Sequence, residues 1–269
     1  MHHPLDQATR LDPMADHRWQ GTTHAAYANM VGPFGGATCA VLLNAALQHP
    51  QRAGDPIALT VNFAGPVADG AFEVEAFPVR TNRSTQHWSL LLTQAGVPCA
   101  SASAVFAQRR PTWGAPESRP PAGMPAPDAL PKAPSEGRPA WVRCYDMRFA
   151  PGDEAFGLDG QEQAHSESRL WVRDAPPRPL DFVALAALAD SFFPRVFVRR
   201  RRVAPIGTIT LSTYFHADAA MLAAQGDRHL LGTARAQVFR DGYHDQSATL
   251  WSHDGHLLAS AHQMVYYRD

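Results

Sequence analysis

Asp190 is the residue whose surroundings point most clearly to chemistry. It lies in the stretch DFVALAALADSFF, residues 181–193, whose other positions from Phe182 onward are apolar or small. A carboxylate buried in such a segment is costly unless it is paired, and burial raises its pKa. Groups of this kind cluster at functional sites. The alternative is a structural aspartate that bonds a backbone amide or an arginine.

Two glycines and two neutral polar residues could assist such a carboxylate. Gly35 and Gly36 begin a predicted helix, where bare backbone N–H groups can donate to a polarised carbonyl oxygen; close backbone packing is the alternative. Thr208 and Gln263 fall in predicted strands and offer uncharged hydrogen bonds, which are most often structural. Gln263 differs because Ala104 stands at its matching position in an internal repeat, so the polar group is specific to one copy.

A run of four arginines, from Arg199 to Arg202, follows the second predicted helix in an expected loop. Guanidinium groups near a site could bind the phosphates of a nucleotide-bearing substrate, whereas most charge runs of this kind are solvated surface. Arg199 and Arg200 are therefore candidate phosphate contacts. The spacing His253-x-x-His256 straddles an Asp-Gly turn and indicates a solvated hairpin rather than a metal site.

Several common signatures are missing from the sequence. It contains no G-x-S-x-G, H-E-x-x-H, P-loop or G-x-G-x-x-G pattern, which argues against a serine hydrolase elbow, a zinc protease and a dinucleotide-binding fold. The formal charge of −1, from 24 basic and 25 acidic residues among 269, gives no reason to expect a nucleic-acid partner. We expect neither a metal nor a redox cofactor.

The cysteines and the N-terminus bear on the compartment. The three cysteines are far apart and never in C-x-x-C spacing, which indicates reduced thiols: Cys39, Cys99 and Cys144. The segment MHHPLDQATRLDP has no apolar core of signal-peptide type, and no stretch approaches the roughly 20 apolar residues of a membrane span. We therefore expect a cytoplasmic protein that does not insert into membranes.

A proline-rich segment divides the chain into two halves. Between residues 111 and 140 proline recurs at nearly every third position, so this linker should run extended over the surface between domains at 1–110 and 141–269. The ends of the two halves resemble each other, because CASASAVFAQR at 99–109 matches LASAHQMVYYR at 258–268. A duplicated unit would leave this pattern.

The same order of elements is predicted in both halves. An apolar helix over 36–48, buried all round, precedes strands that alternate with period two. A second such helix over 181–193, capped by Asp181 and stopped by Pro194, precedes further strands. Two pairs are strong hairpin signals: Asp241-Gly242 and Asp254-Gly255. The sequence therefore predicts an α+β fold in which an antiparallel sheet wraps round one buried helix, twice over.

Both halves resemble the double-hotdog acyl-CoA thioesterases of the thioesterase II type. VGPFGGATCAVLLNAAL, residues 31–47, and the strands after it are similar to the N-terminal hotdog of that family. LAALADSFFP, GTITLSTYFH and LWSHDGHLLASAHQ are similar to the C-terminal hotdog. The resemblance implies two antiparallel sheets, each wrapped round one long buried helix and fused in one chain.

The resemblance also implies a reaction. Family members use an Asp, a Thr or Ser and a Gln of the C-terminal hotdog to position and activate a water that attacks a thioester carbonyl. These residues fall on Asp190, Thr208 and Gln263, and a gapless count back from Tyr214-Phe215-His216 selects Thr208 over Thr210. Asp190 would act as the general base or as a carboxylate that orients the water, while the other two hold the water. The implied activity is hydrolysis of an acyl-CoA to a free acid and CoA, within fatty acid metabolism and without a cofactor.

Two other functions remain open at this point. A hotdog module could bind acyl-CoA without hydrolysing it, and a hydratase or dehydratase could use the same architecture. The latter needs a His paired with an Asp, a pattern that is not found around His24 or His216. Two fused hotdogs reproduce the dimer of single-hotdog enzymes, and such units could pair further into a homo-oligomer. The sequence leaves open the length of the acyl chain and whether CoA or a carrier protein bears the acyl group.

Overall fold

The computed structural model describes residues 2–15, 17–153 and 157–268 of the chain. The N-terminal half comprises α1 (Pro4–Ala8), β1 (Asp12–Pro13), β2 (Arg18–Thr22), η1 (Ala25–Tyr27), α2 (Gly35–Leu47), β3 (Asp55–Phe63), β4 (Ala71–Thr81), β5 (Thr85–Gln94) and β6 (Val97–Ala107). The sequence patterns predict α2 and the strands after it. They miss the short elements before residue 30, which are too brief to show a periodicity.

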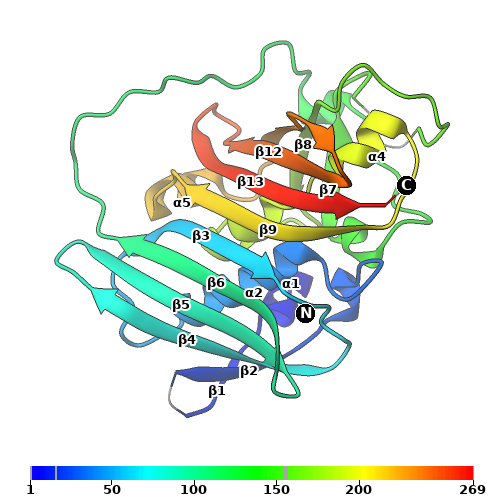
Figure 1. Cartoon of the computed structure of the whole chain (residues 1–269). Helices are drawn as coiled ribbons and strands as arrows, with labels where there is room; N and C mark the ends of the chain where they lie inside the picture. Colours follow the sequence, from blue (N-terminus) through cyan, green and yellow to red (C-terminus); the bar gives the residue numbers. More distant parts are fainter. Residues whose placement is uncertain (1, 16, 154–156, 269) are drawn as a thin grey trace.

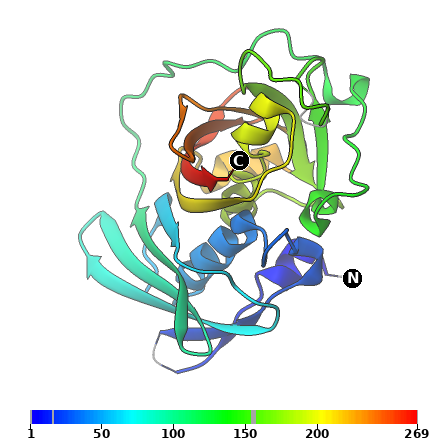
Figure 2. The ribbon, with the colours of Figure 1, turned by 45° about the vertical axis from the view of Figure 1, so that its right-hand side comes forward.

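Helix α2 is the apolar centre of this half. Its side chains are buried almost throughout from Gly36 to Ala46, as expected for a helix that is apolar on every face. Figure 2 shows α2 on the inner side of the curved N-terminal strands. The helix ends at Leu47, shortly before Pro50, which disfavours helical backbone at the residue before it. The predicted range of 36–48 is confirmed to within one residue at each end.

The C-terminal half comprises η3 (Ala140–Cys144), β7 (Tyr145–Phe149), β8 (Ser168–Asp174), α3 (Phe182–Leu188), α4 (Arg195–Arg200), β9 (Ile206–Phe215), α5 (Ala219–Gln225), β10 (Leu230–Arg235), β11 (Phe239–Arg240), β12 (Tyr243–Trp251) and β13 (Leu257–Tyr267). Both hairpin predictions are confirmed. Asp241-Gly242 joins β11 to β12, and Asp254-Gly255 lies in the turn between β12 and β13.

The second buried helix is shorter than the sequence predicts. Asp181 caps α3 as expected, because its side chain accepts from the amide of Ala184 at 2.8 Å. The helix nevertheless ends at Leu188, and Asp190 lies in the turn that follows rather than within the helix. The Ser191 hydroxyl donates to the Leu188 carbonyl at 2.8 Å, a local bond that competes with helical pairing. The predicted range of 181–193 is therefore wrong at its C-terminal end.

Pro194 begins a helix instead of stopping one. It is the N-cap of α4, whose residues Val196 and Val198 are buried. Arg199 and Arg200 form the last turn of α4, so the prediction of a loop at these two residues is wrong. Proline suits the first positions of a helix because its fixed φ is already helical and its missing N–H would be unpaired there. Arg201 ends the helix with a φ of +50°.

The strands of both halves form one continuous sheet. Its order is β1-β2-β4-β5-β6-β3-β9-β13-β12-β10-β8-β7, with β11 paired to β12. Strands β3 and β9 pair antiparallel where the halves meet (Figure 1), and the Thr60 and Ser212 hydroxyls approach to 2.9 Å there. The two wrapped sheets are thus joined edge to edge. On the inner side, α2 packs against α3, with Gly36 so close to Ala187 that a Cβ at Gly36 would lie 2.4 Å from the Ala187 carbonyl oxygen.

The proline-rich linker is extended and partly docked on the C-terminal half. Its described structure is irregular apart from a short 3-10 turn, η2 (Pro127–Ala129), and Figure 1 shows it as a long arc leaving β6. The Trp171 indole donates to the Pro125 carbonyl at 2.8 Å, and Leu130 packs with Trp171, Leu231 and Trp251. Across the described ranges, no helix has the length and apolar character needed to cross a bilayer.

Candidate active site

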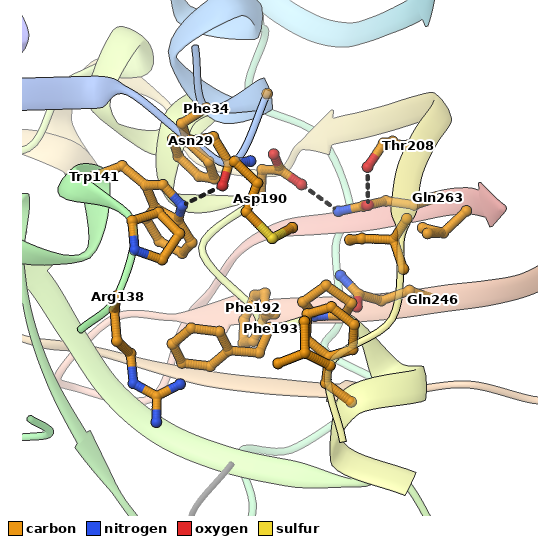
Figure 3. A pocket seen from close by; sticks show the side chains of 18 of the residues that line it. Asn29, Phe34, Arg138, Trp141, Asp190, Phe192, Phe193, Thr208, Gln246 and Gln263 are labelled. Atoms are coloured by element: carbon orange, nitrogen blue, oxygen red, sulfur yellow. Dashed lines mark hydrogen bonds between the residues drawn. The ribbon is translucent and has the colours of Figure 1, made fainter. Parts of the chain in front are cut away.

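A cavity of about 380 Å³ opens beside the turn that carries Asp190. Its wall draws on both halves and on the linker, and includes several aromatic side chains: Phe34, Trp141, Phe192, Phe193, Phe197 and residues 136–139. Phe34 stacks on Trp141 with ring centroids 4.2 Å apart, and the Trp141 indole donates to the Asn29 side chain at 3.2 Å (Figure 3). The two halves are therefore joined at the cavity itself.

Asp190 lies at the end of this cavity with 8% of its surface exposed. The Gln263 side-chain amide donates to its Oδ1 at 2.6 Å, and the backbone amide of Gly36 also donates to the carboxylate. Burial raises the pKa of Asp190 from its usual 3.8 to about 7, and the two hydrogen bonds oppose that rise. Near neutral pH this carboxylate can therefore either hold or release a proton.

Thr208 and Gln263 complete a short chain of hydrogen bonds to Asp190. The Thr208 hydroxyl donates to Gln263 Oε1 at 3.4 Å, so the Gln263 amide nitrogen is turned toward the carboxylate (Figure 3). Thr208 lies on β9 and Gln263 on the adjacent strand β13. The three residues that the sequence selects are thus brought together, and Thr208 rather than Thr210 makes the contact with Gln263.

The two glycines allow the N-terminus of α2 to approach Asp190. A Cβ at Gly35 would lie 2.7 Å from Asp190 Oδ2, so a larger residue would displace the carboxylate. The Gly36 amide donates to Asp190, and the backbone of Gly36 packs closely on the Ala187 carbonyl, so the close-packing explanation applies to Gly36, whereas Gly35 makes room for the Asp190 side chain. Donation from Gly35 or Gly36 to a substrate oxygen stays a prediction.

The arginine run lies apart from Asp190, Thr208 and Gln263. Arg199 pairs with Glu162 at 3.0 Å, and Arg201 pairs with Asp159 at 2.8 Å. These contacts tie α4 to residues 157–167, which precede β8. Arg199 and Arg200 are not among the described residues that line the cavity at Asp190. Phosphate binding by Arg199 and Arg200 stays a prediction, and the ion pair of Arg199 supports a role in holding this segment.

A second cavity, of about 410 Å³, lies on the other side of Gly35 and Thr208. Its lining includes Phe63, Pro66 and Tyr266, while Gly35 and Thr208 border both cavities. A substrate with two arms could therefore occupy both spaces and place the group between its arms near Asp190. Within the described part of the chain, no cluster of three or more His, Cys, Asp or Glu side chains could hold a metal ion.

Sequence reasoning misses most of the cavity wall. Gln246, Trp141 and the linker residues 136–139 all face the cavity, yet they come from separate parts of the chain. Gln246 is a polar residue in an alternating strand, which resembles many surface positions. Only the pairing of β12 with β13, which sets Gln246 directly opposite Gln263, distinguishes it.

Comparisons with known proteins agree with the geometry. Residues 24–107 match a family model for the acyl-CoA thioesterase N-terminal domain, and residues 116–267 match one for the acyl-CoA thioesterase C-terminal domain. No functionally curated protein matches the chain.

Solved structures extend the comparison over the whole chain. A conserved protein of unknown function with a hotdog fold from Alicyclobacillus acidocaldarius is 45% identical, covers 100% of this chain and 99% of its own, and superposes with a TM-score of 0.94. An acyl-CoA thioesterase II from Mycobacterium marinum, 19% identical, covers 98% of each chain with a TM-score of 0.78 and shows the same fold. The chain therefore has a double hotdog fold and belongs to the acyl-CoA thioesterase family.

Proposed function

We propose that the chain hydrolyses an acyl-CoA thioester to a free acid and CoA with an activated water. The observation that carries this proposal is the buried Asp190 carboxylate, which lines the cavity, is held by Gln263 and has a pKa raised to about 7. A general base works best when its pKa lies near the working pH. Family membership supports thioester hydrolysis in general, and the geometry supports these particular residues.

The reaction needs one base and a set of hydrogen bonds. Asp190 takes a proton from a water as the water oxygen attacks the thioester carbonyl. The tetrahedral intermediate then collapses, the carbon–sulfur bond breaks, and the CoA thiolate leaves and takes up the proton that Asp190 had accepted. Thr208 and Gln263 orient the carboxylate and the water, since both lie beside Asp190 and border the cavity. Apart from the attacking water, every group in this route belongs to the chain or to the substrate.

The test is thiol release from short, medium, long and aromatic acyl-CoA substrates by the wild type and by Asp190→Asn. The substitution removes the base and keeps the shape, so turnover should fall by about 10²- to 10⁴-fold. Asp174→Asn is a matched control. Asp174 is also a buried aspartate of the C-terminal half whose pKa is raised to about 7, but it lies at the end of β8, outside the cavity lining.

Three outcomes would contradict the proposal. Unchanged turnover in Asp190→Asn would remove Asp190 from the mechanism. Binding of acyl-CoA by the wild type without release of thiol from any substrate would identify a non-catalytic acyl-CoA-binding module instead. Addition of water to an enoyl-CoA, with no thiol release, would identify a hydratase.

A further inference from the structure

Arg195 is fully buried, and it makes hydrogen bonds to uncharged acceptors. It donates to the carbonyls of Phe193, Ser166 and Ala234, to the Ser168 hydroxyl and to the Gln246 side-chain oxygen. None of the acids in the described ranges forms an ion pair with it. Burial lowers the pKa of Arg195 to about 9, so the guanidinium remains charged at neutral pH. A buried cation therefore lies directly behind the cavity at Asp190.

The bond between Arg195 and Gln246 settles which way the Gln246 amide points. Arg195 Nε can only donate, so the Gln246 atom 3.0 Å from it must be the oxygen Oε1. The amide nitrogen Nε2 is consequently turned to the other side, where Gln246 lines the cavity. Figure 3 shows this nitrogen on the side of the cavity where Gln263 lies. No described residue accepts a hydrogen bond from it, although the side chain is only 2% exposed.

Gln246 has a defined place relative to the reacting groups. It lies on β12 directly opposite Gln263 on β13, so both side chains are on the same face of the sheet. Neighbouring strands are about 4.8 Å apart, which is a few bonds along an acyl chain. Thr208, Gln263 and Gln246 lie on the successive strands β9, β13 and β12, and all three line the cavity at Asp190.

We propose that Gln246, fixed by Arg195, selects acyl groups that carry an oxygen acceptor within the first few carbons beyond the thioester, such as an oxo or hydroxyl group. This inference rests on the proposed thioesterase function. The cavity lining includes apolar side chains such as Phe192, Phe193 and Val265, together with a few charged ones such as Arg138. A plain acyl chain would leave the Gln246 donor unpaired, whereas an oxygen at this depth would accept from it.

The test compares hexanoyl-CoA with 3-oxohexanoyl-CoA and 5-oxohexanoyl-CoA. For each enzyme we take the ratio of kcat/KM for the oxo substrate to kcat/KM for hexanoyl-CoA. Intrinsic differences in thioester reactivity are the same for every enzyme, so they cancel when the ratios of variant and wild type are compared. Gln246→Leu removes the N–H donor and puts an apolar side chain of similar size in its place.

Gln246→Glu guards against a purely structural effect. A glutamate still accepts from Arg195 but offers the substrate no N–H donor. Both variants should lower the ratio by about three- to tenfold for at least one oxo substrate, the effect of one lost hydrogen bond. Gln237→Leu, the same substitution at an exposed residue between β10 and β11, should leave the ratio within about twofold of the wild type.

The possible results separate the two proposals. Equal ratios in the wild type, Gln246→Leu and Gln246→Glu, with all three active, would overturn the inference and leave the thioesterase function intact. A lower ratio in Gln246→Leu alone would also overturn it, because loss of the bond from Arg195 would then explain the effect. Failure of the wild type to hydrolyse any acyl-CoA, with these three substrates and the wider panel all tested, would overturn both proposals.

Discussion

The two halves of the molecule have matching strand orders, but they hold different residues at the positions equivalent to the candidate site. In the first half, Leu59 pairs with Ala104, and a register shift follows between Pro56 and Ala58. In the second half, Leu211 pairs with Gln263, and the register shifts two residues further along β13. Superposing these registers gives the equivalent pairs Pro56 and Thr208, Ala104 and Gln263, and Trp88 and Gln246.

The equivalent positions have different roles in the two halves. In the first half they hold core side chains, and in the second half they line the cavity. Trp88 is 2% exposed and contacts His49 and Phe106, so an aromatic ring occupies the place that Gln246 holds beside a cavity in the other half. The first half nevertheless contributes to the site through Phe34, Gly35 and Gly36 at the start of α2. The C-terminal half supplies the carboxylate and its polar neighbours, and the N-terminal half supplies the helix end that approaches them.

The largest expected effect comes from emptying the position that Trp88 fills. Trp88→Ala should lower the free energy of unfolding by about 3–5 kcal/mol, because it removes a buried aromatic ring and leaves a void. Activity per folded molecule should stay near that of the wild type, since Trp88 lies in the other half from Asp190. Denaturant unfolding and thiol release measure the two quantities. A loss of activity without a loss of stability would show that the halves are not divided in this way.

The next test gives the second half the residue of the first. Gln263→Ala copies Ala104 and removes the hydrogen bonds to Asp190 and from Thr208. Turnover should fall by about 10- to 100-fold, since the carboxylate loses the group that orients it. The pKa of Asp190 should rise further, because the Gln263 bond holds it down. A pH–rate profile of this variant measures both effects.

A buried glutamine of the first half provides the control for that test. Gln86 is 1% exposed and bonds Thr81, the Gln51 carbonyl and the Ala53 amide. Gln86→Ala should cost about 1–3 kcal/mol of stability, because these partners lose a buried hydrogen-bonding group, while kcat/KM is retained. Similar losses of kcat/KM in Gln86→Ala and Gln263→Ala would mean that the second effect is also structural.

Local patterns were sufficient for much of the fold and for two residues of the site, and the family resemblance added Thr208. The apolar run round Asp190 marks it as a buried carboxylate, and the repeat marks Gln263 because Ala104 stands in its place. The same apolar run led to a wrong prediction of the C-terminal end of the helix. Residues from Ser191 to Phe193 are small or apolar like those of the helix before them, but a turn after Leu188 is needed to bring Asp190 to the start of α2.

The rest of the site depends on contacts between distant segments. The direction of the Gln246 amide is set by Arg195, and the burial of Arg195 depends on carbonyls from three separate segments. Joining of the halves through β3 and β9 likewise has no local signal, because a strand edge looks the same in sequence whichever strand pairs with it. Periodicity predicts which segments form helices and strands, but it does not predict which strands pair with one another.

The smallest expected effect is the change of kcat/KM with pH. It distinguishes two buried aspartates of the C-terminal half, Asp190 and Asp174. As a general base, Asp190 works only when ionised, so kcat/KM should rise about tenfold per pH unit up to a midpoint near 7 and then level off. Asp190→Asn should abolish this acid limb. Asp174→Asn should keep it, because Asp174 also has a pKa of about 7 but lies outside the cavity lining.

Stability should respond to both aspartates alike. Each has a folded pKa near 7 and an ordinary value of 3.8, so between about pH 4 and 7 the folded chain binds more protons than the unfolded chain. The free energy of unfolding therefore falls as the pH rises through that window, and either Asp→Asn variant should weaken the fall. A stability profile that both variants flatten, beside an activity profile that only Asp190→Asn removes, would place the base in the cavity. An acid limb that persists in Asp190→Asn and disappears in Asp174→Asn would contradict it.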